Sequence, residues 1–207
     1  MRYRSQNDLA PYLQNQERSR SYLVLSLRVL SRLPIYNLNM SEAFSVRPLT
    51  RDDQAFLWEA LHVALWTPDP PFRQPKEWLT WPHVARCVED WGRTGDLGMI
   101  AMHRETPVGA AWLRLPHAHE QELAYVDEQT PIMGIGVLEP FQRSGVGSRL
   151  LAALIAAART RYDAISLSHH PQNPAARLYA KFGFTEVDQR RTFKILRLDL
   201  NRDIARW

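Results

Sequence analysis

Residues 135–151 read IGVLEPFQRSGVGSRLL, and this stretch decides the fold. The apolar residues 133–138 are typical of a strand, and Pro140 takes the chain out of it because proline cannot donate to a strand ladder. After residues 142–147, apolar side chains recur at helical spacing until about Arg161, at Val146, Leu150, Leu151, Leu154, Ile155 and Ala158. The stretch therefore predicts a strand, a glycine-rich turn and a helix in direct succession.

Such a turn is expected to bind an anion. The first N–H groups of a helix lack acceptors and lie at the positive end of the helix dipole. Gly145 and Gly147 are expected to adopt positive φ and to let a ligand approach the backbone, while Arg143 and Ser148 add a charge and a hydroxyl donor. No lysine followed by Ser or Thr comes after the glycines, and the pattern G-x-G-x-x-G is absent, so neither a P-loop nor a dinucleotide site is indicated.

The remaining elements follow from hydrophobic periodicity. Before the deciding stretch we expect a strand, two helices and a hairpin, at residues 44–49, 56–65, 82–91, 97–102 and 108–115. After it we expect a strand, a helix and two strands, at residues 164–168, 175–182, 184–187 and 193–200. The acidic stretch 116–130 is predicted to be a loop with a short strand near residues 123–126. This order predicts an α/β (α+β) domain, with a mixed central β-sheet of about six or seven strands and helices on both faces.

Charge and cysteine content narrow the function classes. Residues 1–39 hold six arginines against Asp8 and Glu17, a surplus of four that equals the net charge of the whole chain, +4. The neutral body argues against nucleic-acid binding, and no apolar run is long enough for a membrane span. A single cysteine, Cys87, argues against a cysteine-built metal site and is typical of a reducing compartment, so we expect no metal and a cytoplasmic protein. We expect residues 1–39 to be a basic appendage, flexible or upstream of the native start, and residues 40–207 to be the domain.

Several segments resemble the GNAT superfamily of acetyl-CoA-dependent N-acetyltransferases. The turn matches the family pattern of Gln or Arg, two residues, Gly, one residue, Gly or Ala. Its context matches as well: SVRPLTRDD at residues 45–53, the hairpin strand containing VGAAW at 108–112, and NPAARLYAKFGF at 173–184. The resemblance spans residues 45–200. It implies the GNAT fold, acetyl-CoA as co-substrate and transfer of acetyl to a primary amine by direct attack.

The resemblance also implies roles for individual residues. The strand residues Ile135, Gly136 and Val137 are expected to pair with the pantetheine arm, with Gly136 leaving room for it and a main-chain N–H polarising the thioester carbonyl. Asn173 is expected to contact the arm, or only to cap a helix; Tyr179 is expected to protonate the departing thiolate, or only to fill the core. The diphosphate is expected on the turn residues Gln142, Arg143, Ser144, Gly145, Val146, Gly147 and Ser148.

The glutamate that often acts as general base in the family has no counterpart in this chain. Relatives often carry a glutamate in a Pro-Glu-Leu run, whereas this chain has Pro131-Ile132-Met133. The alternatives are a carboxylate acting through water, Glu128 or Asp127, a neutral histidine, His169 or His170, or solvent itself. The sequence leaves this choice open.

The acceptor pocket is expected near the first helices and the facing strands, where aromatic residues are frequent, with Trp112, Tyr125, Trp66 and His62 as candidates. Cys87 is expected in a helix of its own, away from the turn, so no rival nucleophile is predicted. The acceptor is expected to be a small-molecule or protein amine. By analogy with the family, the protein is also expected to form a homodimer. Two other hypotheses are a non-catalytic acyl-CoA-binding regulatory module and a scaffold that binds simple anions.

Overall fold

A computed structural model describes residues 44–70, 73–116 and 123–201. The chain divides by its internal contacts into two units, Met1–Asn39 and Met40–Trp207, and every described element belongs to the second. The basic appendage expected at residues 1–39 lies outside the described residues, so its role stays a prediction.

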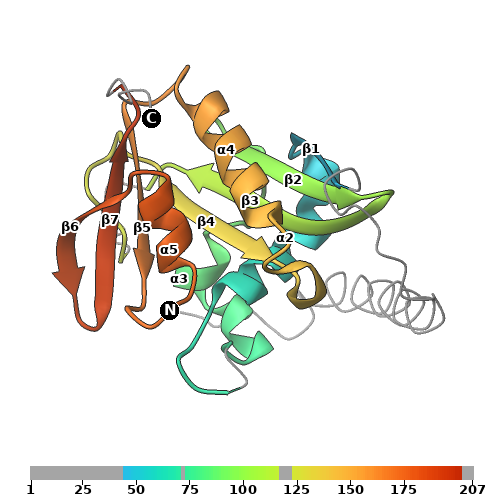
Figure 1. The fold of residues 1–207 in the computed structure, drawn as a ribbon, viewed down its shortest axis with the longest axis horizontal. Coiled ribbons are helices and arrows are strands. Elements are labelled where there is room, and N and C mark those ends of the chain that lie inside the picture. The colour runs from blue at the N-terminus through green and yellow to red at the C-terminus, as the bar shows by residue number, and fades with distance from the viewer. Residues whose placement is uncertain (1–43, 71–72, 117–122, 202–207) are drawn as a thin grey trace, which may run out of the picture. The chain divides into compact units, whose positions relative to one another are not determined.

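A single mixed sheet organises this unit (Figure 1). Its strands follow the order β1-β2-β3-β4-β5-β7-β6, and every neighbouring pair is antiparallel except β4 and β5. The strands are β1 (Phe44–Pro48), β2 (Leu97–His103), β3 (Thr106–Arg114), β4 (Ile132–Val137), β5 (Ala164–His169), β6 (Thr185–Arg190) and β7 (Phe193–Asp199). The order of elements and the mixed sheet confirm the prediction from periodicity.

Helices cover both faces of the sheet, as predicted (Figure 1). The helical segments are η2 (Arg51–Asp53), α2 (Gln54–Ala64), η3 (Lys76–Thr80), α3 (Pro82–Ala85), η4 (Glu139–Phe141), α4 (Val146–Ala158) and α5 (Ala176–Lys181). One hydrophobic core joins α2 to Ala110 and Trp112 of β3. It also includes the α3 region, by which we mean η3, α3 and the turns that follow up to Trp91. The other joins α4 and α5 to the opposite face, where Ala111 and Leu113 point. None of the helices in the described ranges has the length and apolar character needed to cross a membrane.

A capping box forms at η2, the turn that leads directly into α2. The Asp53 carboxylate accepts hydrogen bonds from the N–H of Thr50 at 2.8 Å and from its hydroxyl at 3.0 Å. Arg47 pairs with the same carboxylate at 2.7 and 2.8 Å. The hydrogen bond from Arg47 is the main cause that lowers the pKa of Asp53, so the carboxylate stays ionised and holds β1 against α2.

The helix predicted at residues 82–91 is shorter than expected. Only Pro82–Ala85 is α-helical, and a series of turns follows. Arg114 on β3 is the physical reason: its Nη1 donates to the carbonyls of Arg86 at 2.6 Å and Glu89 at 2.8 Å, which draws those carbonyls toward the sheet. The apolar side chains of this segment, Val84, Val88 and Trp91, are all buried against α2.

The short strand predicted near residues 123–126 is absent from the described residues, which form a loop there. Its carbonyls are bound by side chains in place of a strand ladder. Ser166 Oγ donates to Ala124 O at 2.8 Å, and Arg190 Nη1 donates to Leu123 O at 3.0 Å and Tyr125 O at 2.7 Å. The loop is thereby held against β5 and β6.

Candidate active site

The site begins where β4 and β5 separate. These parallel neighbours share a single register pair, Ile132 with Ser166, reinforced by Ser166 N donating to Pro131 O at 3.0 Å. Beyond Ile132 the rest of β4 has no pairing with β5, whereas its other edge pairs with β3 along its whole length. The sheet is therefore split on one side of β4.

The main chain of β4 presents hydrogen-bonding groups to this split. Leu138 N donates to Val108 O at 2.9 Å, so even-numbered residues of this segment direct their main-chain groups toward β3. Because the direction alternates along a strand, the groups of Met133, Ile135 and Val137 face the β5 side. An extended ligand can add to this edge as a strand does.

Two glycines of β4 face the side of α2. A Cβ on Gly134 would lie 2.2 Å from the Trp112 ring, and a Cβ on Gly136 would lie 2.1 Å from Ala60 O. We expected Gly136 to leave room for a cofactor arm. That role stays a prediction, and the structure shows a further constraint on this glycine, namely the close approach of the α2 backbone.

The turn after β4 has an open, non-helical start. Gln142 is extended, with φ −68° and ψ 153°, and the helix begins only at Val146. Gly145 has φ +89°, as predicted, and a Cβ placed there would meet no protein atom within 4 Å. The prediction for Gly147 was wrong, because it lies inside α4 with ordinary φ; Arg143 takes the second left-handed position instead, with φ +59°.

This turn concentrates unpaired N–H donors. Among the described residues, none of the six main-chain N–H groups of residues 143–148 has an acceptor, and the helical ladder starts with Arg149 N donating to Gly145 O. Two side chains hold the turn: Gln142 Nε2 donates to Val137 O at 2.9 Å, and Ser144 Oγ donates to Phe141 O at 2.5 Å. A turn with such donors at the N-terminus of a 13-residue helix has the chemistry to bind an anion.

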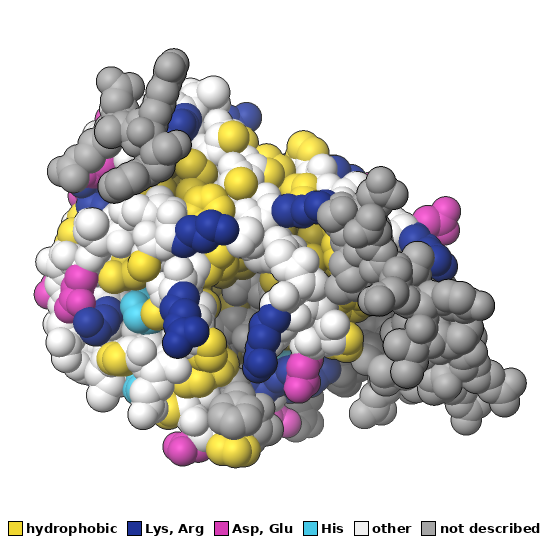
Figure 2. All heavy atoms as spheres, in the orientation of Figure 1, with side chains coloured by type: hydrophobic (Ala, Val, Ile, Leu, Met, Phe, Trp, Pro, Cys, Tyr) yellow, Lys and Arg dark blue, Asp and Glu magenta, His cyan; other side chains and the backbone are white. Residues whose placement is uncertain are grey.

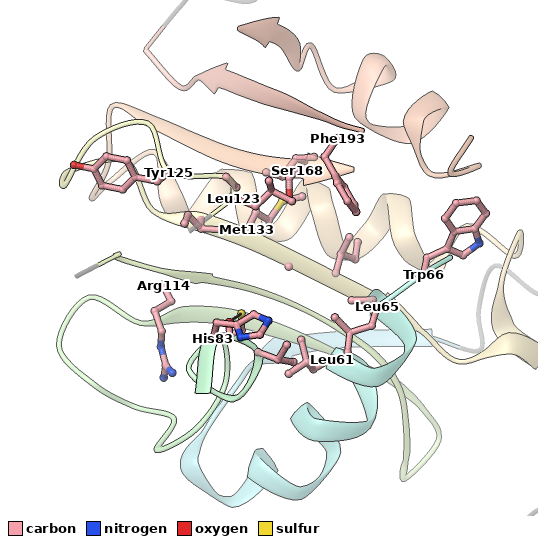
Figure 3. Close-up of a pocket in the computed structure, with 18 of the residues that line it drawn as sticks. Leu61, Leu65, Trp66, His83, Arg114, Leu123, Tyr125, Met133, Ser168 and Phe193 are labelled. Carbon is pink, nitrogen blue, oxygen red and sulfur yellow. Dashed lines mark hydrogen bonds between the residues drawn. The ribbon is translucent and has the colours of Figure 1, made fainter. Parts of the chain in front are cut away.

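A cavity of about 1280 Å³ continues from the split across the sheet (Figure 3). In that view, Phe193 and Ser168 lie on one side of β4, and Leu61 and Leu65 lie on the other. Trp66 lies at one end of the cavity. Figure 2 shows the same unit hollowed between α5 and the turn before α4, with Lys and Arg side chains around the hollow. The lining combines apolar and aromatic residues from α2, the α3 region, the 123–126 loop, β4, β5, α5 and the β6–β7 turn.

Tyr179 and Asn173 line this cavity. Burial raises the pKa of Tyr179 to about 12, so its hydroxyl remains protonated and available as a hydrogen-bond donor at ordinary pH. Asn173 Oδ1 accepts from Ala175 N at 2.9 Å, which leaves its Nδ2 available to a ligand. His169 is buried beside Tyr179, with ring centroids 5.8 Å apart, and its Nδ1 donates to His170 O at 2.8 Å.

The other predicted residues divide between the cavity and its surroundings. Trp112, Trp66 and Tyr125 line it, although the Tyr125 ring points away from its middle (Figure 3). His62 does not line it: its Nε2 lies 2.9 Å from Gln74 O, and burial lowers its pKa. Glu128 is exposed on a turn outside the lining.

Asp127 shapes that same turn. Its carboxylate accepts from the N–H groups of Gln129 and Thr130, at 2.9 and 2.7 Å, and from the Thr130 hydroxyl at 2.8 Å. Although burial opposes the effect, these hydrogen bonds lower the pKa of Asp127. Its geometry is that of a turn-stabilising carboxylate.

Sequence reasoning missed the contribution of the β6–β7 hairpin. Arg190, Arg191 and Phe193 all line the cavity, although they lie far along the chain from the glycine-rich turn. The helix expected around Cys87 is absent, since this residue lies in the turns after α3; Cys87 also lines the cavity. No local pattern in the sequence indicates that the β6–β7 hairpin or Cys87 lines the cavity, because this depends on which segments the fold brings together.

Comparisons with known proteins agree with this geometry. Residues 57–184 match the acetyltransferase (GNAT) family. Among curated relatives, N-alpha-acetyltransferase 50 of Danio rerio is 28% identical over 111 residues, which cover 52% of this chain and 62% of the relative. The probable N-acetyltransferase san of Drosophila melanogaster is 29% identical over 102 residues, covering 48% of this chain and 52% of that protein. The chain thus spans little more than half the length of these relatives.

Solved structures share the fold. YncA, a putative acetyltransferase from Salmonella typhimurium solved with its cofactor acetyl-CoA, has a TM-score of 0.54 at 21% identity, covering 79% of this chain and 98% of that one. The ribosomal-protein-S18-alanine N-acetyltransferase of Escherichia coli has a TM-score of 0.56 at 18% identity, with the same coverage. With the family match extending over more than half of its residues, the chain belongs to the acetyltransferase (GNAT) family.

Proposed function

We propose that this protein transfers an acetyl group from acetyl-CoA to a primary amine by direct attack. The observation that supports this most is the pairing of two features in one chain segment: the split beside β4 and the six unpaired N–H groups of residues 143–148 that directly follow it. Acetyl-CoA requires an open strand edge for its extended arm, followed directly by a turn with free N–H groups for its diphosphate.

The residues present fit acetyl-CoA. The open space at Gly145 allows a diphosphate to approach the N–H groups, and Arg143 and Ser148 have no partner among the described residues that would compete for their donors. The main-chain groups of Ile135 are free to pair with an amide-containing arm. When bound, the thioester supplies an activated acetyl group.

Two groups of the protein would then assist the transfer. A main-chain N–H at Ile135 faces the split and can donate to the oxygen on which negative charge develops. Tyr179 can donate its hydroxyl hydrogen to the departing sulfur. With a pKa of about 12 it acts as a hydrogen-bond donor throughout the working range, never as a base.

The proton of the attacking ammonium leaves, in this proposal, to solvent. No Asp or Glu occurs among the described residues that line the cavity, and Glu128 and His169 are not among them. An acceptor with a low amine pKa is therefore favoured. At pH 7.5 an α-amine with a pKa near 7.8 is neutral roughly 250 times as often as a lysine side chain with a pKa near 10.4. The name of one relative, N-alpha-acetyltransferase 50, points to the same class.

Release of free thiol from acetyl-CoA, measured with a panel of α-amines and alkyl amines, tests the proposal. We expect turnover without a burst, faster with α-amines, and retained in Cys87→Ala because no acyl-enzyme forms. Tyr179→Phe should bind acetyl-CoA normally but turn over slowly, whereas Glu128→Gln and His169→Asn should stay within about threefold of the unaltered protein. Tight acetyl-CoA binding with no turnover for any amine would favour the non-catalytic acyl-CoA-binding module.

A further inference from the structure

The charge of the cavity lining is one-sided. Among the described lining residues every ionised side chain at neutral pH is an arginine: Arg86, Arg114, Arg190 and Arg191. No carboxylate is present there to receive a cationic group on a substrate. An acceptor that carries extra positive charge would find no carboxylate partner among these lining residues.

Three of the four arginines already have partners, and Arg86 Nε donates to Pro82 O at 3.2 Å. Arg114 makes a two-point ion pair with Asp96, at 2.9 Å from Nε to Oδ1 and 2.7 Å from Nη2 to Oδ2, in addition to its bonds to main-chain carbonyls. Arg190 pairs with Asp188 at 2.9 Å and holds the 123–126 loop. Arg114 and Arg190 therefore serve the architecture around the cavity.

Arg191 differs from these three. It occupies the tip of the β6–β7 hairpin, lines the cavity and is exposed, and its guanidinium makes no hydrogen bond or ion pair with any described residue. A guanidinium offers a planar, two-point donor that fits a carboxylate. Because Arg191 is exposed and also lines the cavity, it lies where the cavity meets solvent, and its side chain can reach an entering acceptor.

We propose that Arg191 selects acceptors that carry a carboxylate close to the reacting amine. This inference rests on the proposed function and names its substrate class: an α-amine followed by an acidic group, on a peptide or on a free amino acid. Polyamines, aminoglycoside-like amines and basic peptides are disfavoured by the same charge.

Paired peptides test this directly, with alanine first and either aspartate or lysine second in otherwise identical sequences. Both turnover, read as free thiol, and equilibrium binding, read from tryptophan fluorescence in the presence of CoA, are measured. We expect the protein to favour the aspartate peptide roughly tenfold in both readouts. Arg191→Glu should abolish or reverse that ratio, and Arg191→Gln should bring it near one.

Arg104 provides a matched control. It lies at the β2–β3 turn with φ +56°, against +55° for Arg191, is likewise exposed, and does not line the cavity. Arg104→Glu should keep the wild-type ratio. A wild-type ratio of one or below in binding, or an unchanged ratio in Arg191→Glu, would overturn the inference.

The two readouts separate this inference from the proposed function. Absent turnover with a preserved binding ratio contradicts acetyl transfer but supports carboxylate selection. Comparing free aspartate with the peptide identifies the source of the carboxylate: productive use of either supports the inference, and use of neither, with lysine peptides accepted, refutes it.

Discussion

Replacing Gly145 with alanine separates the anion-binding role of the turn from its part in folding. Gly145 has φ +89° and ψ −8°, a left-handed conformation that costs an L-residue about 1–2 kcal/mol. An added Cβ meets no protein atom within 4 Å, so no steric cost adds to this. We therefore expect Gly145→Ala to lower the free energy of unfolding by about 1–2 kcal/mol while the fold persists.

The loss of affinity should be larger than this folding defect suggests. The new methyl group would occupy the open space through which a diphosphate reaches the N–H groups of the turn. Weakening one hydrogen bond to a charged group costs about 1.5–3 kcal/mol, which corresponds to roughly a 10- to 150-fold increase in the Kd of CoA. Weakening two would cost more.

Isothermal titration with CoA and urea unfolding without ligand measure the two effects separately. Gly183→Ala is the matched control, because Gly183 also has positive φ, +85°, and its Cβ would make only an ordinary 3.6 Å contact with Leu198. It should lose similar stability and keep its CoA affinity. Equal Kd values for Gly145→Ala and the unaltered protein would refute the assignment of the diphosphate to this turn.

Other consequences follow from buried contacts. Tyr179→Phe should lower kcat by about 100-fold or more with little change in CoA affinity. The pKa of Tyr179 is raised to about 12 in the folded protein, so its contribution to stability is present below pH 10 and is lost as pH rises toward 12. Alkaline unfolding followed by circular dichroism should therefore show that the free energy of unfolding falls by about 2–3 kcal/mol over this range. The Phe variant should lack this fall. Gly136→Ala should destabilise by about 3 kcal/mol in urea titrations, because its Cβ would lie 2.1 Å from Ala60 O; an unchanged midpoint would contradict the observed packing. Asp96→Asn should cost about 3–5 kcal/mol by leaving Arg114 buried without its counter-charge, and full stability in this variant would argue against that pair.

Local chemistry explains why much of the site could be predicted from the sequence. The strand, turn and helix around residues 135–151 follow one another directly, so proline, glycine and the helical apolar repeat determine them without distant contacts. The capping box that Thr50 and Asp53 form at η2, directly before α2, is equally local. Such features depend on neighbours within a few residues, which a single sequence displays.

Features that depend on distant partners were missed. Arg114 shortens the helix at Pro82–Ala85 by binding carbonyls about 25 residues away, and periodicity in that segment cannot reveal it. One miss has a local cause. Gly147 was expected to have positive φ but does not, because α4 starts one residue before it, and Arg143 has positive φ instead. The basic hairpin tip at Arg191 reaches the cavity only because β7 lies beside β5.

Amide chemical shifts measured while CoA is titrated into the labelled protein show which main-chain groups contact the cofactor. We expect the N–H resonances of residues 143–148 to shift most, together with those of Met133, Ile135 and Val137 on the open edge of β4. Saturable CoA binding that leaves these resonances unmoved, with the changes located elsewhere in the domain, would rule out binding of the diphosphate and the arm at this turn and strand.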